Sequence, residues 1–97
     1  MATQKELGDK FELFIEKYSN FKIGKTGQTS QERYDQEYSK IYSKIVEVGN
    51  SDEKETIDDF EKYMIERFGD LSNCDNQQVG GGDMTDSKVY LVYIVYN

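Results

Sequence analysis

One carboxylate lies where the hydrophobic pattern of this chain predicts a buried position. Glu61 falls on the apolar face of a predicted helix, four residues after one apolar position and three before another. An ionised carboxylate that faces inward is costly unless it meets a cation, a metal or hydrogen-bond donors. Glu61 is therefore a candidate functional acid, and the alternative is a salt bridge to Lys or Arg on a neighbouring element. The apolar face is made by Ile57, Phe60, Met64, Ile65 and Phe68.

A second candidate is Arg33, in the first turn of another predicted helix. A cation at that position opposes the helix dipole, so its placement gains nothing locally. It lies beside the tyrosines of the same helix and soon after the turn that follows Gly24. It is either a functional cation or a solvated arginine that stacks on a tyrosine.

Several reaction classes are excluded by residue types. The chain has no His and a single cysteine, Cys74. A zinc centre and a Ser-His-Asp or Cys-His nucleophile therefore lack their ligands or bases. The stretch Gly24-Lys25-Thr26 does not make a phosphate-binding loop, because the earlier glycine and the spacing are absent.

Three helices are predicted to carry these residues. Thr3 with Glu6 and Thr29 with Glu32 form capping boxes, which open the first two helices. Ser51 is expected to cap the third, which ends at Gly69. The apolar stripe of the first helix is Leu7, Phe11, Phe14, Ile15 and Tyr18, and that of the second is Tyr34, Tyr38, Ile41 and Tyr42.

Three strands are predicted between and after the helices, at residues 21–23, 45–48 and 89–96. Residues 25–28 have the composition of a turn, and residues 70–87 that of a long polar loop containing Gly80–Gly82. The last strand is apolar on both faces, which is typical of the middle of a sheet. We therefore expect a single α+β domain, residues 1–97, with a small three-stranded sheet and packed helices.

The ordered set of these features resembles the GIY-YIG nuclease superfamily, and its viral and phage branches in particular. Residues 21–26, with the sequence FKIGKT, are similar to the family's second strand, and residues 60–65 to its glutamate helix. Asn76 followed by Gly80–Gly82 is similar to the family's asparagine and glycine loop. The resemblance covers about residues 20–82, with matching order and spacing.

The chain departs from the family pattern in two places. The family opens with a "GIY" strand directly before the "YIG" strand, whereas a helix precedes residue 21 here. A similar strand lies at the far end, at residues 92–97 or, in another register, from Val89-Tyr90. A circular permutation that puts the first strand last would explain this order. The second departure is Lys22, which stands where the family has the tyrosine of "YIG".

The resemblance implies hydrolysis of nucleic-acid phosphodiesters with one Mg²⁺ or Mn²⁺ ion. Glu61 would hold the metal, and Arg33 would offset the charge that grows on the phosphate. Tyr90 or Tyr93 would position or activate water, and Lys22 would neutralise phosphate or act as the base if its pKa were strongly lowered. Two further residues, Lys25 and Asn76, would bind or orient the substrate.

The bulk charge favours a different class of function. Nineteen acidic residues against twelve basic ones give a net charge of −7, whereas nucleic-acid binders usually carry the opposite sign. We expect nucleic acid to bind only weakly to this domain on its own. The alternative function is a non-catalytic interaction or inhibitor protein that imitates nucleic acid or docks a basic protein. A third interpretation is a piece of a larger nuclease whose DNA-targeting domain is elsewhere.

Location follows from the same composition. No apolar run reaches the roughly 18–20 residues that a membrane span needs. No secretory segment precedes the first helix, and a lone thiol suits a reducing compartment. We expect an intracellular, cytoplasmic protein, in a host cell if it is viral or phage-encoded.

Two geometric expectations test the nuclease hypothesis. The C-terminal strand should lie between residues 21–23 and another strand, with both faces covered. In addition, Lys22, Arg33, Glu61 and one of Tyr90 or Tyr93 should line a single concave face of the sheet.

Overall fold

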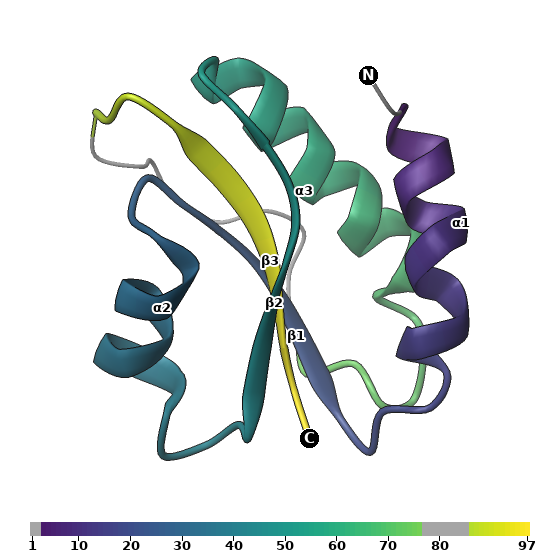
Figure 1. The fold of residues 1–97 in the computed structure, drawn as a ribbon. Helices are drawn as coiled ribbons and strands as arrows, with labels where there is room; N and C mark the ends of the chain where they lie inside the picture. Colours follow the sequence, from purple (N-terminus) through teal and green to yellow (C-terminus); the bar gives the residue numbers. More distant parts are fainter. Residues whose placement is uncertain (1–2, 77–85) are drawn as a thin grey trace.

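The computed structural model describes residues 3–76 and 86–97. In these residues the chain forms the expected α+β fold, an antiparallel sheet between two helical layers (Figure 1). None of the helices in this part of the chain has the length and apolar composition that crossing a membrane requires. The elements are α1 (Gln4–Ile15), β1 (Phe21–Thr26), α2 (Ser30–Arg33), the π-helical turn η1 (Tyr34–Tyr38), β2 (Lys44–Ser51), α3 (Lys54–Phe68) and β3 (Tyr90–Tyr96).

The C-terminal strand β3 is the centre of the sheet. The strand order is β1-β3-β2, and β3 pairs antiparallel with both neighbours. Its residues are buried from Tyr90 to Val95, so the expectation of a central strand covered on both faces is confirmed. On β2 the register shifts between Glu47 and Gly49, which leaves Val48 as a bulge.

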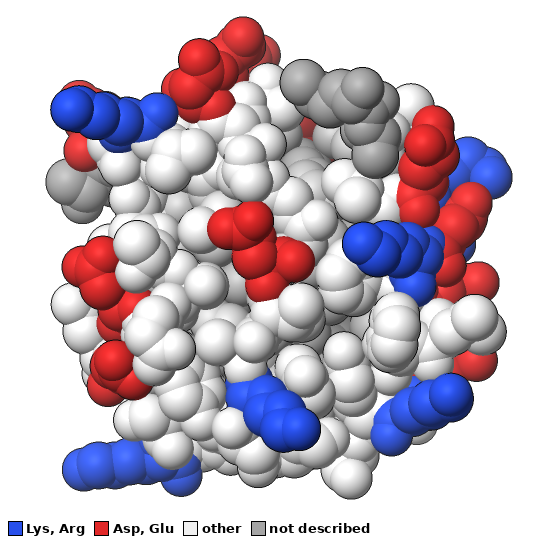
Figure 2. Space-filling model, viewed as in Figure 1, with Lys and Arg blue, Asp and Glu red and all other residues white. Residues whose placement is uncertain are grey.

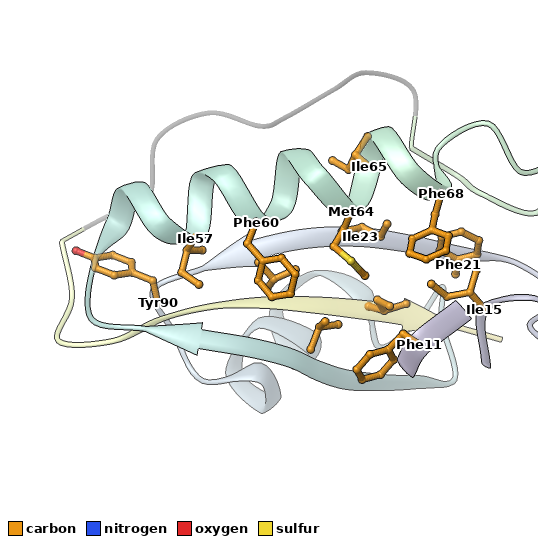
Figure 3. Close-up of a cluster of buried hydrophobic side chains, with 13 residues drawn as sticks. Phe11, Ile15, Phe21, Ile23, Ile57, Phe60, Met64, Ile65, Phe68 and Tyr90 are labelled. Carbon is orange, nitrogen blue, oxygen red and sulfur yellow. The ribbon is translucent and has the colours of Figure 1, made fainter. Parts of the chain in front are cut away.

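The larger apolar layer lies between the sheet and the helices α1 and α3 (Figure 3). Met64 and Ile57 are almost fully buried in it, and each such side chain contributes about 1.5–3 kcal/mol. This layer fixes α3 against β1 and β3, which determines where Glu61 can point. Its buried members are Phe11, Ile15, Phe21, Ile23, Val48, Ile57, Phe60, Met64, Ile65, Phe68, Tyr90, Val92 and Ile94.

The smaller layer lies on the opposite face of the sheet, under α2 and η1 (Figure 1). Tyr38 of η1 and Tyr42, which lies after η1, supply the side that faces the sheet. The strand β3 supplies the rest, through Leu91, Tyr93 and Val95. Alternation along β3 therefore sends successive side chains to two different helical layers.

Some predicted boundaries and stripe positions are wrong. β1 continues through Lys25 and Thr26, which the sequence assigns to a turn, because both find partners on β3. The hydroxyl of Ser51 accepts from the amide of Glu53 instead of capping α3, which begins at Lys54. Phe14, expected in the core, is largely exposed because α1 packs through a narrower face than its stripe suggests.

The second helix also ends earlier than its tyrosine stripe predicts. Its regular part covers only Ser30–Arg33, and the wider η1 turn ends at Tyr38. Tyr42 is still buried, whereas Ile41 is largely exposed. The stripe thus marks buried tyrosines correctly and overestimates the helix.

Candidate functional site

Glu61 is buried on α3, as its place in the apolar face predicts. Its residue is 4% exposed, and Lys25 from β1 brings its ammonium 3.6 Å from Glu61 Oε1. The same ammonium lies 2.7 Å from Oδ1 of Asp58, one turn earlier on α3. The salt bridge to a neighbouring element, considered as the alternative for Glu61, is therefore present.

Burial and charge act in opposite directions on Lys25. Desolvation is the largest single influence and lowers the pKa of Lys25, because burial disfavours the ammonium. Asp58 and Glu61 together outweigh it, so the pKa of Lys25 is raised. The lysine thus stays charged between the two carboxylates at neutral pH.

These residues do not fit the implied divalent cation. Mg²⁺ needs several oxygen ligands in near-octahedral geometry, and Asp58 and Glu61 are the two carboxylates that meet at Lys25. Both already contact the ammonium of Lys25. Among the described residues, no group of three or more His, Cys, Asp or Glu is placed to hold a metal.

A second cluster lies on the other face of the sheet, under α2 and η1. Lys22 Nζ is 5.8 Å, and Arg33 Cζ 5.9 Å, from the centroid of the Tyr38 ring. Arg33 Nε donates to the hydroxyl of Tyr93 at 3.4 Å, and that hydroxyl donates to Tyr38 Oη at 3.1 Å. Two cations and the phenol of Tyr93 therefore lie around the Tyr38 ring.

Gly24 is the reason why Tyr93 can sit so close to β1. A Cβ at Gly24 would collide with the phenol of Tyr93, whose Cε1 would be only 2.9 Å away. Glycine therefore permits the close approach that brings the Tyr93 hydroxyl to Arg33. The glycine of the "YIG"-like strand has a packing role that its position in the motif alone does not explain.

The expected convergence on one concave face does not occur. Lys22, Arg33 and Tyr93 lie on the α2 side of the sheet, whereas Glu61 lies on the α3 side. Tyr90 is also on the α3 side, where its hydroxyl accepts from the amide of Ser87 at 2.9 Å. The reason is strand alternation, since neighbouring residues of β1 and β3 point to opposite faces.

Asn76 has a structural role at the outer edge of β1. Its side-chain amide accepts from Ile23 N at 2.8 Å and donates to Ile23 O at 2.9 Å. The preceding residues continue this pairing, because Phe21 bonds to Asn73 O and to the amide of Asp75. The amide expected to bind substrate is thus used to close the sheet edge. The glycine run Gly80–Gly82 falls outside the described residues.

Sequence reasoning missed two members of these clusters. Asp58 looks like a solvated residue on the flank of α3, and its i, i+3 spacing from Glu61 was the available signal. Tyr38 looks like one core position among several, although two cations flank its ring. A cation–aromatic contact between separate elements leaves no spacing pattern in the sequence.

Comparison with protein-family models, curated protein sequences and solved structures found no match. The resemblance to the GIY-YIG superfamily therefore depends on the residues of this chain alone.

Proposed function

We propose that this chain is a non-catalytic interaction domain whose acidic surface docks a basic protein partner. One observation carries the proposal. The carboxylate that a nuclease would use, Glu61, is neutralised inside the fold by Lys25 and lies across the sheet from Arg33. The implied metal centre would require Lys25 to leave a buried ion pair.

The charge distribution supports docking of a basic partner. The net charge is −7, because nineteen acidic residues outnumber twelve basic ones. A net negative charge attracts a basic partner to the surface and raises its association rate. The same charge repels the phosphates of nucleic acid.

A nuclease remains the second candidate, favoured by two observations. β3 pairs antiparallel with β1, which is the pairing that a circularly permuted "GIY" strand would make. Lys22, Arg33 and Tyr93 also gather around Tyr38 on one face, as three of the implied catalytic residues would. Neither observation brings Glu61 to that face.

A cleavage assay with one variant separates the two candidates. We expect purified protein to leave DNA and RNA intact with Mg²⁺ or Mn²⁺. Glu61→Gln should lower the free energy of unfolding by about 1–3 kcal/mol, because Lys25 loses a charged partner. Glu66→Gln, which removes an exposed charge from the same helix, is the matched control and should change stability by less than about 0.5 kcal/mol.

The opposite outcome is equally clear. Metal-dependent cleavage that disappears in Glu61→Gln, while the variant keeps its stability, would establish the nuclease and overturn the proposal. The binding half has its own readout, which is salt-sensitive binding of a synthetic peptide of alternating lysine and valine. If no such peptide binds at low salt, docking of a basic partner is wrong.

A further inference from the structure

The two edges of the sheet are finished differently. At the β1 edge, residues 73–76 bond to both backbone groups of Phe21 and both of Ile23 at 2.7–2.9 Å. At the β2 edge, no hydrogen bond reaches the backbone of Ile45 or Glu47 from outside the sheet within the described residues. One edge therefore has a strand-like cover, whereas no described residue bonds to the outward backbone groups of the other.

The pairing along the sheet shows which groups of β2 face outward. The backbone N–H and C=O groups of Phe21 and Ile23 point away from β3. The residue between them, Lys22, is therefore the one whose backbone bonds to its partner Val95. Because backbone groups alternate along β3, those of Tyr96 and Ile94 point toward β2, where they pair with Lys44 and Val46. The amides and carbonyls left on the outer edge of β2 belong to Ile45 and Glu47.

The surroundings of this edge suit an added strand. α1 reaches over β2, since Leu7 lies 3.4 Å from where a Cβ of Gly49 would be. The side chains of Ile45 and Val46 are only partly buried on the two faces of the strand. Figure 2, viewed as in Figure 1 with β2 toward the viewer, shows acidic atoms at the centre of this side, within a largely uncharged area that other charged side chains surround.

Charge indicates which occupant fits. A second copy would bring another −7 to the interface, so self-pairing opposes the field of the molecule. Glu47 is exposed on the open edge and favours a basic residue opposite it. The regular edge is short, because the bulge at Val48 ends it, and bulges of this kind limit unwanted pairing.

We infer that the β2 edge binds an extended segment of the partner protein, with alternating apolar and basic residues, as a fourth strand. This inference rests on the proposed interaction function and names its surface. Main-chain hydrogen bonds to Ile45 and Glu47 hold the segment, and side chains on its two faces meet Val46 and Ile45. The negative charge then attracts the partner, and the β2 edge determines the position and direction of the bound segment.

Two peptides test the inference on the intact chain. The probe is an eight-residue peptide of alternating lysine and valine, and its control carries an N-methyl group on every backbone nitrogen. The control keeps the side chains and their charge but loses the backbone donors of both edges. We expect the control to bind at least about tenfold more weakly. The probe should also slow amide exchange at Ile45 and Glu47.

A pair of variants makes the test site-specific. Glu47→Pro removes an outward-facing donor at a position where edge strands tolerate proline, and Glu47→Gln removes only the charge. We expect Glu47→Pro to weaken probe binding more than Glu47→Gln, with circular dichroism unchanged in both.

Each other outcome overturns the inference in a distinct way. Equal binding of probe and N-methylated control would place the basic partner elsewhere on the acidic surface, leaving the proposed function intact. Self-association that Glu47→Pro abolishes, seen by light scattering, would replace the partner with a second copy. Absence of binding by both peptides would remove the proposed function as well.

Discussion

At the scale of single residues, Lys25 explains how the fold tolerates Glu61. Its ammonium contacts Glu61 and Asp58 from a side chain that is 10% exposed. The sequence could not show this, because it placed Lys25 in a turn, where the direction of a side chain is undetermined. The pairing of Lys25 with Val92 shows that Lys25 belongs to strand β1. Its side chain therefore lies on the same face as that of Ile23, two residues earlier, and points toward α3. Glu61 itself was predictable, since the helical period alone places it inward.

Removing the cation should therefore cost more than removing both charges. We expect Lys25→Met to lower the free energy of unfolding by about 3–5 kcal/mol, because Glu61 stays buried and loses the ammonium of Lys25. Lys25→Met combined with Glu61→Leu should recover most of that loss. Urea denaturation followed by circular dichroism measures both. A double variant that is less stable than Lys25→Met would contradict the role of Lys25 as the counter-charge of Glu61.

At the scale of elements, α1 is fastened to α3 by Arg67. Its guanidinium donates to Asp9 at 2.6 Å and to the hydroxyl of Tyr63 at 3.1 Å, and it lies 3.5 Å from Glu12. A Cβ at Gly8 would run into the same guanidinium, so glycine makes room for it. The hydrogen bond from Arg67 is the main cause of a lowered pKa at Asp9, with Lys5 adding to it.

The contact between α1 and α3 through Asp9 and Arg67 should weaken at acid pH and in the variant Arg67→Ala. Asp9 has a folded pKa below its ordinary value, so its contribution is present above about pH 4 and is lost as the pH falls through the folded value. We expect Arg67→Ala to speed amide exchange along α1 and to remove part of the acid sensitivity. Arg67→Lys should restore little, because one ammonium cannot replace the guanidinium that donates to Asp9 and Tyr63 at the same time. Exchange rates in α1 that match the wild-type chain would contradict this role.

Element prediction succeeded where local signals coincide with packing. The cap of α1 forms as expected, with Thr3 Oγ1 accepting from Glu6 N. Phe14 failed because helical spacing marks a broad apolar stripe, while the neighbours of α1 cover only its narrower part. Phe11 and Ile15 are the positions they cover.

At the scale of the whole molecule, the order of strands was predictable and the distribution of helices over the two faces was not. The two-faced apolarity of β3 identifies it as the central strand from sequence alone. Spacing also shows that Glu61 and the tyrosines of η1 point inward. It carries no information on which face of the sheet each helix covers, and that choice separates Glu61 from Arg33.

The stacked pair Tyr18 and Tyr96 should make the stability of the fold depend on alkaline pH. Tyr18, after α1, stacks on Tyr96 of β3 with centroids 4.0 Å apart. Burial, aided by Tyr96, raises the pKa of Tyr18 to about 12. The stabilisation is therefore complete below pH 10 and is lost as the pH rises toward 12. We expect tyrosine absorbance to titrate in two phases in the folded chain, with Tyr18→Phe reducing the later one. A single phase near pH 10 would contradict the burial of Tyr18.

The central position of β3 also has a consequence for the order in which the chain is made. β1 and β2 lie at residues 21–51 and have no ladder with each other, so both wait for residues 90–96 before any sheet can form. During synthesis, α3 emerges with its apolar face but without the strand it covers. The domain therefore closes late, in one step that joins distant segments, which is slow for a chain of this size. Until then, the apolar face of α3 and the edges of β1 and β2 are exposed, which favours association between incomplete chains.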